Sequence, residues 1–105
     1  MKENESDIEY FVLEIRKIAA SHQLGLSLNE AKQQVDEILQ KMKGTLSDDK
    51  SDQAAKWQAL LDALKIYNRN TVDPRWAKII NHANYRIKSR LHTAMFYRKR
   101  FHQSK

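Results

Sequence analysis

The side chains best suited to chemistry lie in the last third of the chain, where basic and aromatic residues alternate with apolar ones. Residues 74–105 contain nine Lys and Arg and no Asp or Glu, whereas residues 1–73 contain ten Lys and Arg against thirteen acids. These two segments therefore carry net charges of +9 and −3, which together give the net charge of +6. Such an asymmetry concerns binding partners and association rates rather than fold.

If the segment from residue 74 is one helix, cations and aromatic rings lie opposite its apolar stripe. At about 100° per residue, one row lies roughly 140° to 200° around the helix from Trp76, and its members are Lys78, Tyr85, His92, Phe96 and Lys99. A second row on the flank holds Arg75, Arg86, Arg90, Tyr97 and Arg100. Lys and Arg neutralise phosphates, and exposed bases stack on aromatic rings. We therefore predict a binding surface made of Lys78, Tyr85, Arg86, Arg90, His92, Phe96, Tyr97, Lys99 and Arg100.

An anion-binding surface of this kind suits three kinds of partner. A polyanion such as nucleic acid is favoured, an acidic protein surface is the second, and peripheral contact with an anionic membrane is the third. The chain has no RNP, KH, zinc-finger or helix-turn-helix pattern, so the nucleic-acid signal is electrostatic only. Two structural alternatives stay open: the surface is ordinary solvated polar surface, or Tyr85 and Phe96 pack beneath another helix of the same chain.

Patterns that would indicate catalysis or metal binding are absent from the sequence. No two of the four histidines have the i, i+3 or i, i+4 spacing of a helical metal site; they are His22, His82, His92 and His102. There is no cysteine and no glycine-rich phosphate loop. The acidic pairs 36–37 and 48–49 are expected on a solvated helix face and near the start of a helix. We predict a protein that is not an enzyme and that needs no metal or cofactor.

The scarcity of Gly and Pro, two and one residues respectively, favours a few long helices over a sheet. Ser6 and Ser27 each precede a Glu by three residues and are predicted to begin helices as capping boxes. Gly25 and Gly44 are predicted to end those two helices. Apolar residues recur at helical spacing in four segments, which gives helices at about 6–23, 28–43, 51–68 and 74–102.

The third helix is predicted to begin near Ser51, with Ser47 as the other candidate cap, and Asp73-Pro74 is predicted to begin the fourth. Trp57, Tyr67 and Trp76 are predicted core aromatics. The fourth helix is roughly 29 residues, against roughly 17 for the others, so its end should project beyond its partners. We predict an all-α, single-domain antiparallel four-helix bundle over residues 1–105, with a long, basic, overhanging C-terminal helix.

The polar, acidic N-terminal segment does not resemble a secretory signal, and no apolar run approaches the ~18 residues of a membrane span. Cysteine is absent, as is common in a reducing compartment. We therefore expect a cytoplasmic protein. In length, predicted helix number and basic charge the chain resembles the bacteriocin immunity proteins of Gram-positive bacteria. That resemblance carries no motif residues. It implies the alternative function of a cytoplasmic antagonist that acts by contact with a protein or a membrane surface. A third possibility is a structural subunit whose overhanging helix completes a homodimer.

Overall fold

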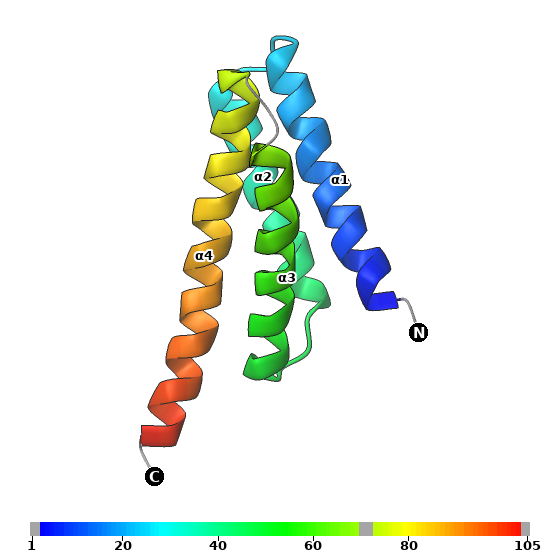
Figure 1. Ribbon diagram of the computed structural model, residues 1–105. Helices are drawn as coiled ribbons and strands as arrows, with labels where there is room; N and C mark the ends of the chain where they lie inside the picture. The colour runs from blue at the N-terminus through cyan, green and yellow to red at the C-terminus, as the bar shows by residue number, and fades with distance from the viewer. Residues whose placement is uncertain (1–2, 70–72, 104–105) are drawn as a thin grey trace.

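The computed structural model describes residues 3–69 and 73–103, and it describes the side chains of residues 7–67 and 73–95. These residues form four helices: α1 (Glu3–Gln23), α2 (Leu28–Thr45), α3 (Lys50–Arg69) and α4 (Pro74–Gln103) (Figure 1). No strand occurs in the two described ranges. The all-α prediction is confirmed, and the predicted helix limits are within three residues of the observed ones.

The junction between α1 and α2 follows the predicted pattern. Gly25 adopts a positive φ of 124°, which is accessible to glycine at little cost. The Leu26 N–H donates to the Ser21 carbonyl at 3.0 Å, and the Gly25 N–H donates to the His22 carbonyl at 3.2 Å. This pair of hydrogen bonds is a Schellman motif. Ser27 then caps α2, because its hydroxyl oxygen accepts from the Glu30 N–H at 3.2 Å.

Two predicted helix boundaries are wrong. The first helix begins at Glu3, so Ser6 lies inside α1, and acidic residues preceding Ser6 are themselves favourable in a first helical turn. Gly44 lies inside α2 and does not end it. The last carbonyls of α2 are satisfied instead by the Leu46 N–H, which donates to Lys43, and by the Thr45 hydroxyl, which donates to Met42. A left-handed glycine is therefore not required there.

The third helix begins at Lys50, and its cap is Asp49 rather than Ser47 or Ser51. The Asp49 carboxylate accepts from the Ser51 N–H at 2.9 Å, and the Asp49 carbonyl accepts from the Gln53 N–H. Ser47 instead accepts a hydrogen bond from the Asp49 N–H at 3.3 Å. A carboxylate is favoured over a hydroxyl at this position because its charge also interacts with the helix dipole.

Asp73 begins α4 as predicted and also joins it to α1. Its carboxylate accepts from the Arg75 N–H at 2.8 Å and from the Gln23 side-chain amide at 2.7 Å. The hydrogen bond from Gln23, and next the one from the Arg75 backbone, hold the pKa of the Asp73 carboxyl below its ordinary value. One side chain therefore fixes both the start of α4 and its position beside the end of α1.

The apolar stripe of α4 packs against all three other helices. Its fully buried residues include Ile79, Ile80, Ala83 and Ile87, which meet the apolar faces of the other helices in one continuous core. Trp57 is buried, and Tyr67 and Trp76 are partly buried against that core, so the three predicted core aromatics are confirmed. No polar or charged residue is buried among the described side chains.

One pair of helices does not pack together. Within the described ranges every pair of helices makes close backbone contacts except α2 and α3. α1 and α4 each contact both of these helices and so lie between them. The space between the C-terminal part of α2 and the N-terminal part of α3 is consequently open, with α4 along its floor.

Truncation of the core should be costly. Leu61 on α3 is 3% exposed, and Leu61→Ala should lower the free energy of unfolding by about 2–5 kcal/mol because it leaves a cavity in a close-packed core. Urea denaturation followed by circular dichroism measures this change. The matched control is Leu13→Ala, at a residue that is 51% exposed. Equal losses for the two variants would contradict the assigned buried face of α3.

Asp73 should make stability depend on pH. Its folded-state pKa is below the ordinary value, so its stabilisation is present above the ordinary pKa of an aspartate and is lost as the pH falls through the lower folded-state pKa. Asp73→Ala should lower the thermal midpoint at neutral pH and flatten the acid side of the profile. Asp73→Asn should retain most of the capping and remove only the pH dependence. Thermal denaturation between pH 2 and pH 7 tests both, and an unchanged acid profile in Asp73→Asn would contradict this role.

Candidate anion-binding site

The tertiary structure divides the predicted binding residues into two groups. Lys78, Tyr85 and His92 are exposed on the outer face of α4, and we call them the outer row. Arg86 and Arg90 are half-buried and turn toward the space between α2 and α3. The side chains of the other four predicted residues lie outside those that the structure describes; these are Phe96, Tyr97, Lys99 and Arg100.

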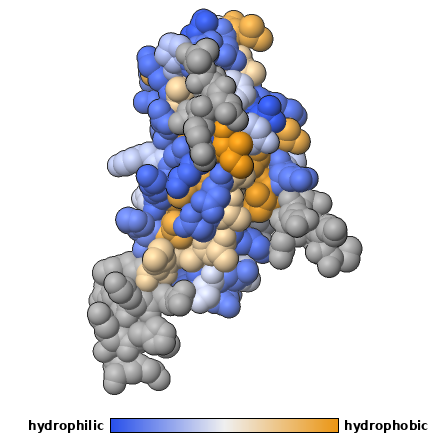
Figure 2. All heavy atoms as spheres, in the orientation of Figure 1, coloured by the Kyte–Doolittle hydropathy of each residue, from blue (hydrophilic) through white to orange (hydrophobic). Residues whose placement is uncertain are grey.

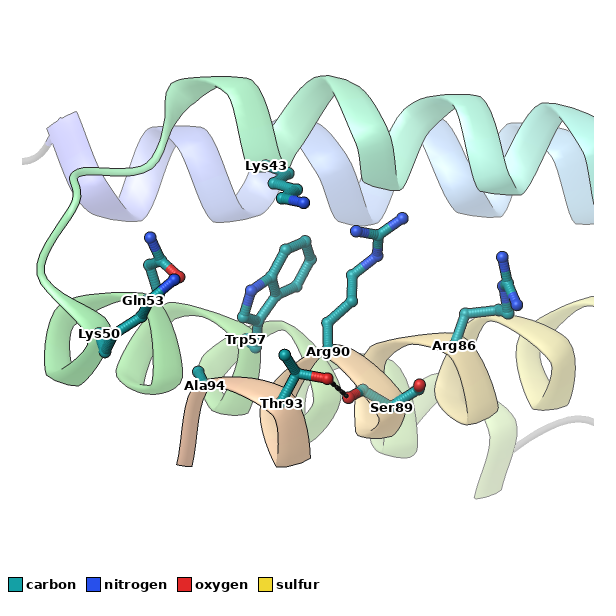
Figure 3. A pocket seen from close by; sticks show the side chains of 9 residues that line it. All are labelled: Lys43, Lys50, Gln53, Trp57, Arg86, Ser89, Arg90, Thr93 and Ala94. Atoms are coloured by element: carbon teal, nitrogen blue, oxygen red, sulfur yellow. Dashed lines mark hydrogen bonds between the residues drawn. The ribbon is translucent and has the colours of Figure 1, made fainter. Parts of the chain in front are cut away.

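Arg86 and Arg90 line an open hollow of about 670 Å³ between α2, α3 and α4 (Figure 3). We call it the basic hollow, and its lining residues are Lys43, Lys50, Gln53, Trp57, Arg86, Ser89, Arg90, Thr93 and Ala94. Four of them are Lys or Arg, and none of the residues described at its wall is Asp or Glu. Three helices thus bring positive charge to one place.

Arg90 is the central cation of the basic hollow. Its guanidinium lies over the Trp57 ring, 5.5 Å from the ring centroid. In Figure 3 it extends from α4 beside the indole and toward Lys43 on α2. Burial, and next the charge of Arg86, lower the pKa of the Arg90 guanidinium, while the charge of Asp36 acts to raise it. Among the described side chains Arg90 takes part in no ion pair, so the aromatic ring face is its main compensation.

Asp36 on α2 holds the neighbouring Arg86 in position. Its Oδ1 atom accepts from the Arg86 Nε at 3.1 Å and lies 3.1 Å from the His82 Nε2. His82 and Arg86 are one turn apart on α4, so a single carboxylate from α2 anchors two successive turns. The prediction that Asp36 belongs to a solvated face is wrong in this respect, because the packing of α2 on α4 turns this carboxylate toward α4.

Two polar side chains of the hollow each donate a hydrogen bond to the backbone of the protein. The Thr93 hydroxyl donates to the Ser89 carbonyl at 3.0 Å, and the Gln53 amide donates to the Ser47 carbonyl at 2.7 Å. The charged groups of the lining are guanidinium and ammonium groups. Such groups form the strong, charge-assisted hydrogen bonds that carboxylates and phosphates accept.

The outer row is a separate and more exposed surface. Tyr85 is 70% exposed, so the alternative in which it packs beneath another helix is wrong. It lines a shallow groove with Lys78 and His82 of α4 and Lys32 of α2. His92 is exposed farther along the helix. The outer row therefore offers scattered positive charge and one accessible ring, whereas the basic hollow gathers its cations around one open recess.

Sequence reasoning missed Lys43, Lys50 and the role of Trp57 beside Arg90. The only local signal is that Arg86 and Arg90 are spaced by four residues and face the same side of a helix. The contributions of α2 and α3 depend on how the helices pack.

No protein-family model matches this chain, and no curated protein or solved structure is significantly similar to it. Among the described residues there is no group of three or more His, Asp or Glu able to hold a metal ion. None of the helices, over their described residues, is both long and apolar enough to cross a membrane.

Replacement of Asp36 tests the anchoring of α2 on α4. Asp36→Asn should lower the free energy of unfolding by about 0.5–1 kcal/mol, since the two interactions it weakens are partly exposed to solvent. The control is Glu37→Gln, which changes the charge equally at an exposed neighbour and should have little effect. Urea denaturation at low ionic strength compares the two variants. Equal destabilisation would mean that the net charge, rather than the Asp36 contacts, is responsible.

Proposed function

We propose that this protein is a non-enzymatic binding protein that holds nucleic acid on the basic surface of α4 and the adjoining basic hollow. The observation that carries the proposal is the convergence of Lys43 from α2 and Lys50 from α3 with two arginines of α4, at a wall without a described carboxylate. The phosphates of a nucleic acid are a partner for such a site, because they release condensed counterions when Lys and Arg neutralise them.

The charge distribution along the chain supports a long anionic ligand rather than an isolated small anion. The acid-free segment 74–105 carries nine Lys and Arg, and α4 spans residues 74–103. A helix of this length extends about 45 Å at about 1.5 Å per residue, which is enough to follow several phosphates. Exposed Tyr85 on the outer row provides a ring on which an unpaired base can stack.

The proposed arrangement is an antiparallel four-helix bundle whose basic C-terminal end overhangs. It is supported by the short connections between helices and by the length of α4, 30 residues against 18 to 21 for the others. In Figure 1 the C-terminal end of α4 lies well away from α1. Such an end would offer Phe96, Tyr97, Lys99 and Arg100 to the ligand. The absence of cysteine suits a reducing, cytoplasmic location.

A protein antagonist is the second candidate, and a different surface favours it. Leu13 on α1 and Ile66 on α3 are each more than half exposed, and Tyr10 is 43% exposed. Figure 2 shows hydrophobic surface where α1 lies beside α3. A groove between these helices is lined by Ile8, Val12, Leu13 and Tyr67 among others. Exposed apolar surface of this kind is typical of contact with another protein.

Charge reversal on α4 tests the nucleic-acid proposal. Wild-type protein should bind mixed-sequence single-stranded DNA with an affinity that falls steeply as KCl rises. Reversal of Lys78, Lys88 and Lys99 to Glu should abolish binding at about 0.1 M salt, because these residues supply phosphate contacts along the helix. Fluorescence anisotropy of a labelled oligonucleotide, repeated at several KCl concentrations, gives both affinity and salt slope.

The matched control reverses three lysines on the other helices: Lys17, Lys41 and Lys65, all of them exposed. This variant has the same net charge as the α4 variant. It should retain most of the binding if the α4 surface is the site. An equal loss of DNA affinity in both variants would mean that the interaction depends only on overall charge. If the wild-type chain does not bind DNA at low salt, the proposed function is rejected in favour of the antagonist.

A further inference from the structure

The basic hollow differs from the rest of the positive surface in its shape and in the ligand it can accept. The outer row lies on the exposed face of α4, partly along a shallow groove, where an extended backbone can lie across it. The basic hollow is recessed between α2 and α3, with α4 at its floor. A nucleic-acid strand that passes along the outside of α4 therefore reaches the exposed lysines of this helix more easily than it reaches Arg90.

Trp57 does not serve as a platform for a base. It is only 2% exposed, and Arg90 lies over its ring. The hollow is therefore unsuited to stacking recognition, although it contains an aromatic residue. The positively charged side chains of its lining come from α2, α3 and α4. This arrangement selects a compact group that has several acceptor oxygens and more than one negative charge.

A terminal phosphate fits these requirements better than an internal phosphodiester. A phosphate monoester carries a charge of about −1.5 to −2 at neutral pH and has three acceptor oxygens. An internal phosphodiester carries one charge, and both of its ester oxygens continue into the chain. A monoester can enter the recess end-on, with the attached sugar toward the open side. Arg86 is partly neutralised by Asp36, whereas Arg90 has no carboxylate partner among the described residues, so Arg90 is the cation that gains most from such a ligand.

We propose that the basic hollow is a binding site for a terminal phosphate monoester, with Arg90 as the central contact and Lys43, Lys50 and Arg86 around it. The recess would hold the same chemical group from a phosphorylated nucleic-acid end or from free phosphate. The assignment of this phosphate to the end of a nucleic acid rests on the proposed function. The phosphate site itself does not depend on it.

The intrinsic fluorescence of Trp57 provides a direct readout for the site. The chain contains two tryptophans, so Trp76→Phe leaves Trp57 as the single reporter, and circular dichroism checks that this variant is folded. Titration with inorganic phosphate and with pyrophosphate should change the Trp57 emission in a saturable manner. Sodium chloride at matched ionic strength should not. Since Arg90 contacts the Trp57 ring, occupation of the site should alter the environment of the indole.

Oligonucleotides with and without a 5′-phosphate provide the second arm. The phosphorylated single strand should bind about tenfold more tightly, the gain expected from one or two additional charge-assisted hydrogen bonds. Lys43→Gln and Arg90→Gln should each remove most of this gain, so that the phosphorylated and unphosphorylated strands then bind with nearly equal affinity. Lys43 is exposed on α2, so its replacement tests the site even if Arg90→Gln destabilises the fold.

Lys88→Gln is the matched control, because it removes one positive charge from an exposed residue of α4 outside the hollow. This variant should bind both oligonucleotides more weakly by the same factor and keep the tenfold difference in affinity between them. Equal binding of the two oligonucleotides, together with an unchanged Trp57 emission in phosphate, would overturn the phosphate site and leave the proposed function standing. A phosphate preference that survives in both Lys43→Gln and Arg90→Gln would also overturn it, since the phosphate would then bind elsewhere. Saturable phosphate binding lost in Lys43→Gln, without binding of any oligonucleotide, would support the site and reject its nucleic-acid source.

Discussion

The burial of one apolar stripe of α4 against three other helices is the constraint on which the rest of the structure depends. Ile79, Ile80, Ala83 and Ile87 recur at helical spacing and are fully buried. Because α4 contacts α1, α2 and α3 at once, these residues fix the rotation of α4 about its own axis. The directions of the other described side chains of α4 follow from this rotation, including those of Arg86 and Arg90.

The direction of these cations explains why a basic site forms at all. α4 buries its stripe between helices that do not pack on each other, so its flank faces the open space between α2 and α3. Arg86 and Arg90 lie on that flank, at the edge of the core, where long side chains can keep their aliphatic parts on apolar surface and direct their charges outward. Partial burial of a guanidinium is unfavourable, and the Trp57 ring and the nearby Asp36 offset part of that cost. Positive charge thus gathers where the packing leaves an opening.

The helix ends show how local signals compete. At residues 24–27 the glycine, its hydrophobic follower and the capping serine agree, and the structure follows all three. At the start of α3 three potential caps lie within five residues, and the carboxylate of Asp49 is preferred to either serine. Gly44 is compatible with a helix end but does not enforce one, because neighbouring donors satisfy the last carbonyls of α2. A capping residue therefore identifies a helix boundary reliably only where no better partner lies close by.

The sequence by itself determined the four helices, the apolar stripe of each and the acid-free, basic character of the last third. These properties depend on residues within one or two helical turns of each other, so the spacing of the side chains is enough to predict them. Only the tertiary structure decided that Arg86 and Arg90, on the flank of α4, join Lys43 and Lys50 around Trp57. It also decided that Asp36 reaches across from α2 to two turns of α4. Such contacts join residues that are tens of positions apart, and no local spacing encodes them, because they arise only when the helices pack and leave α2 and α3 separated by α4.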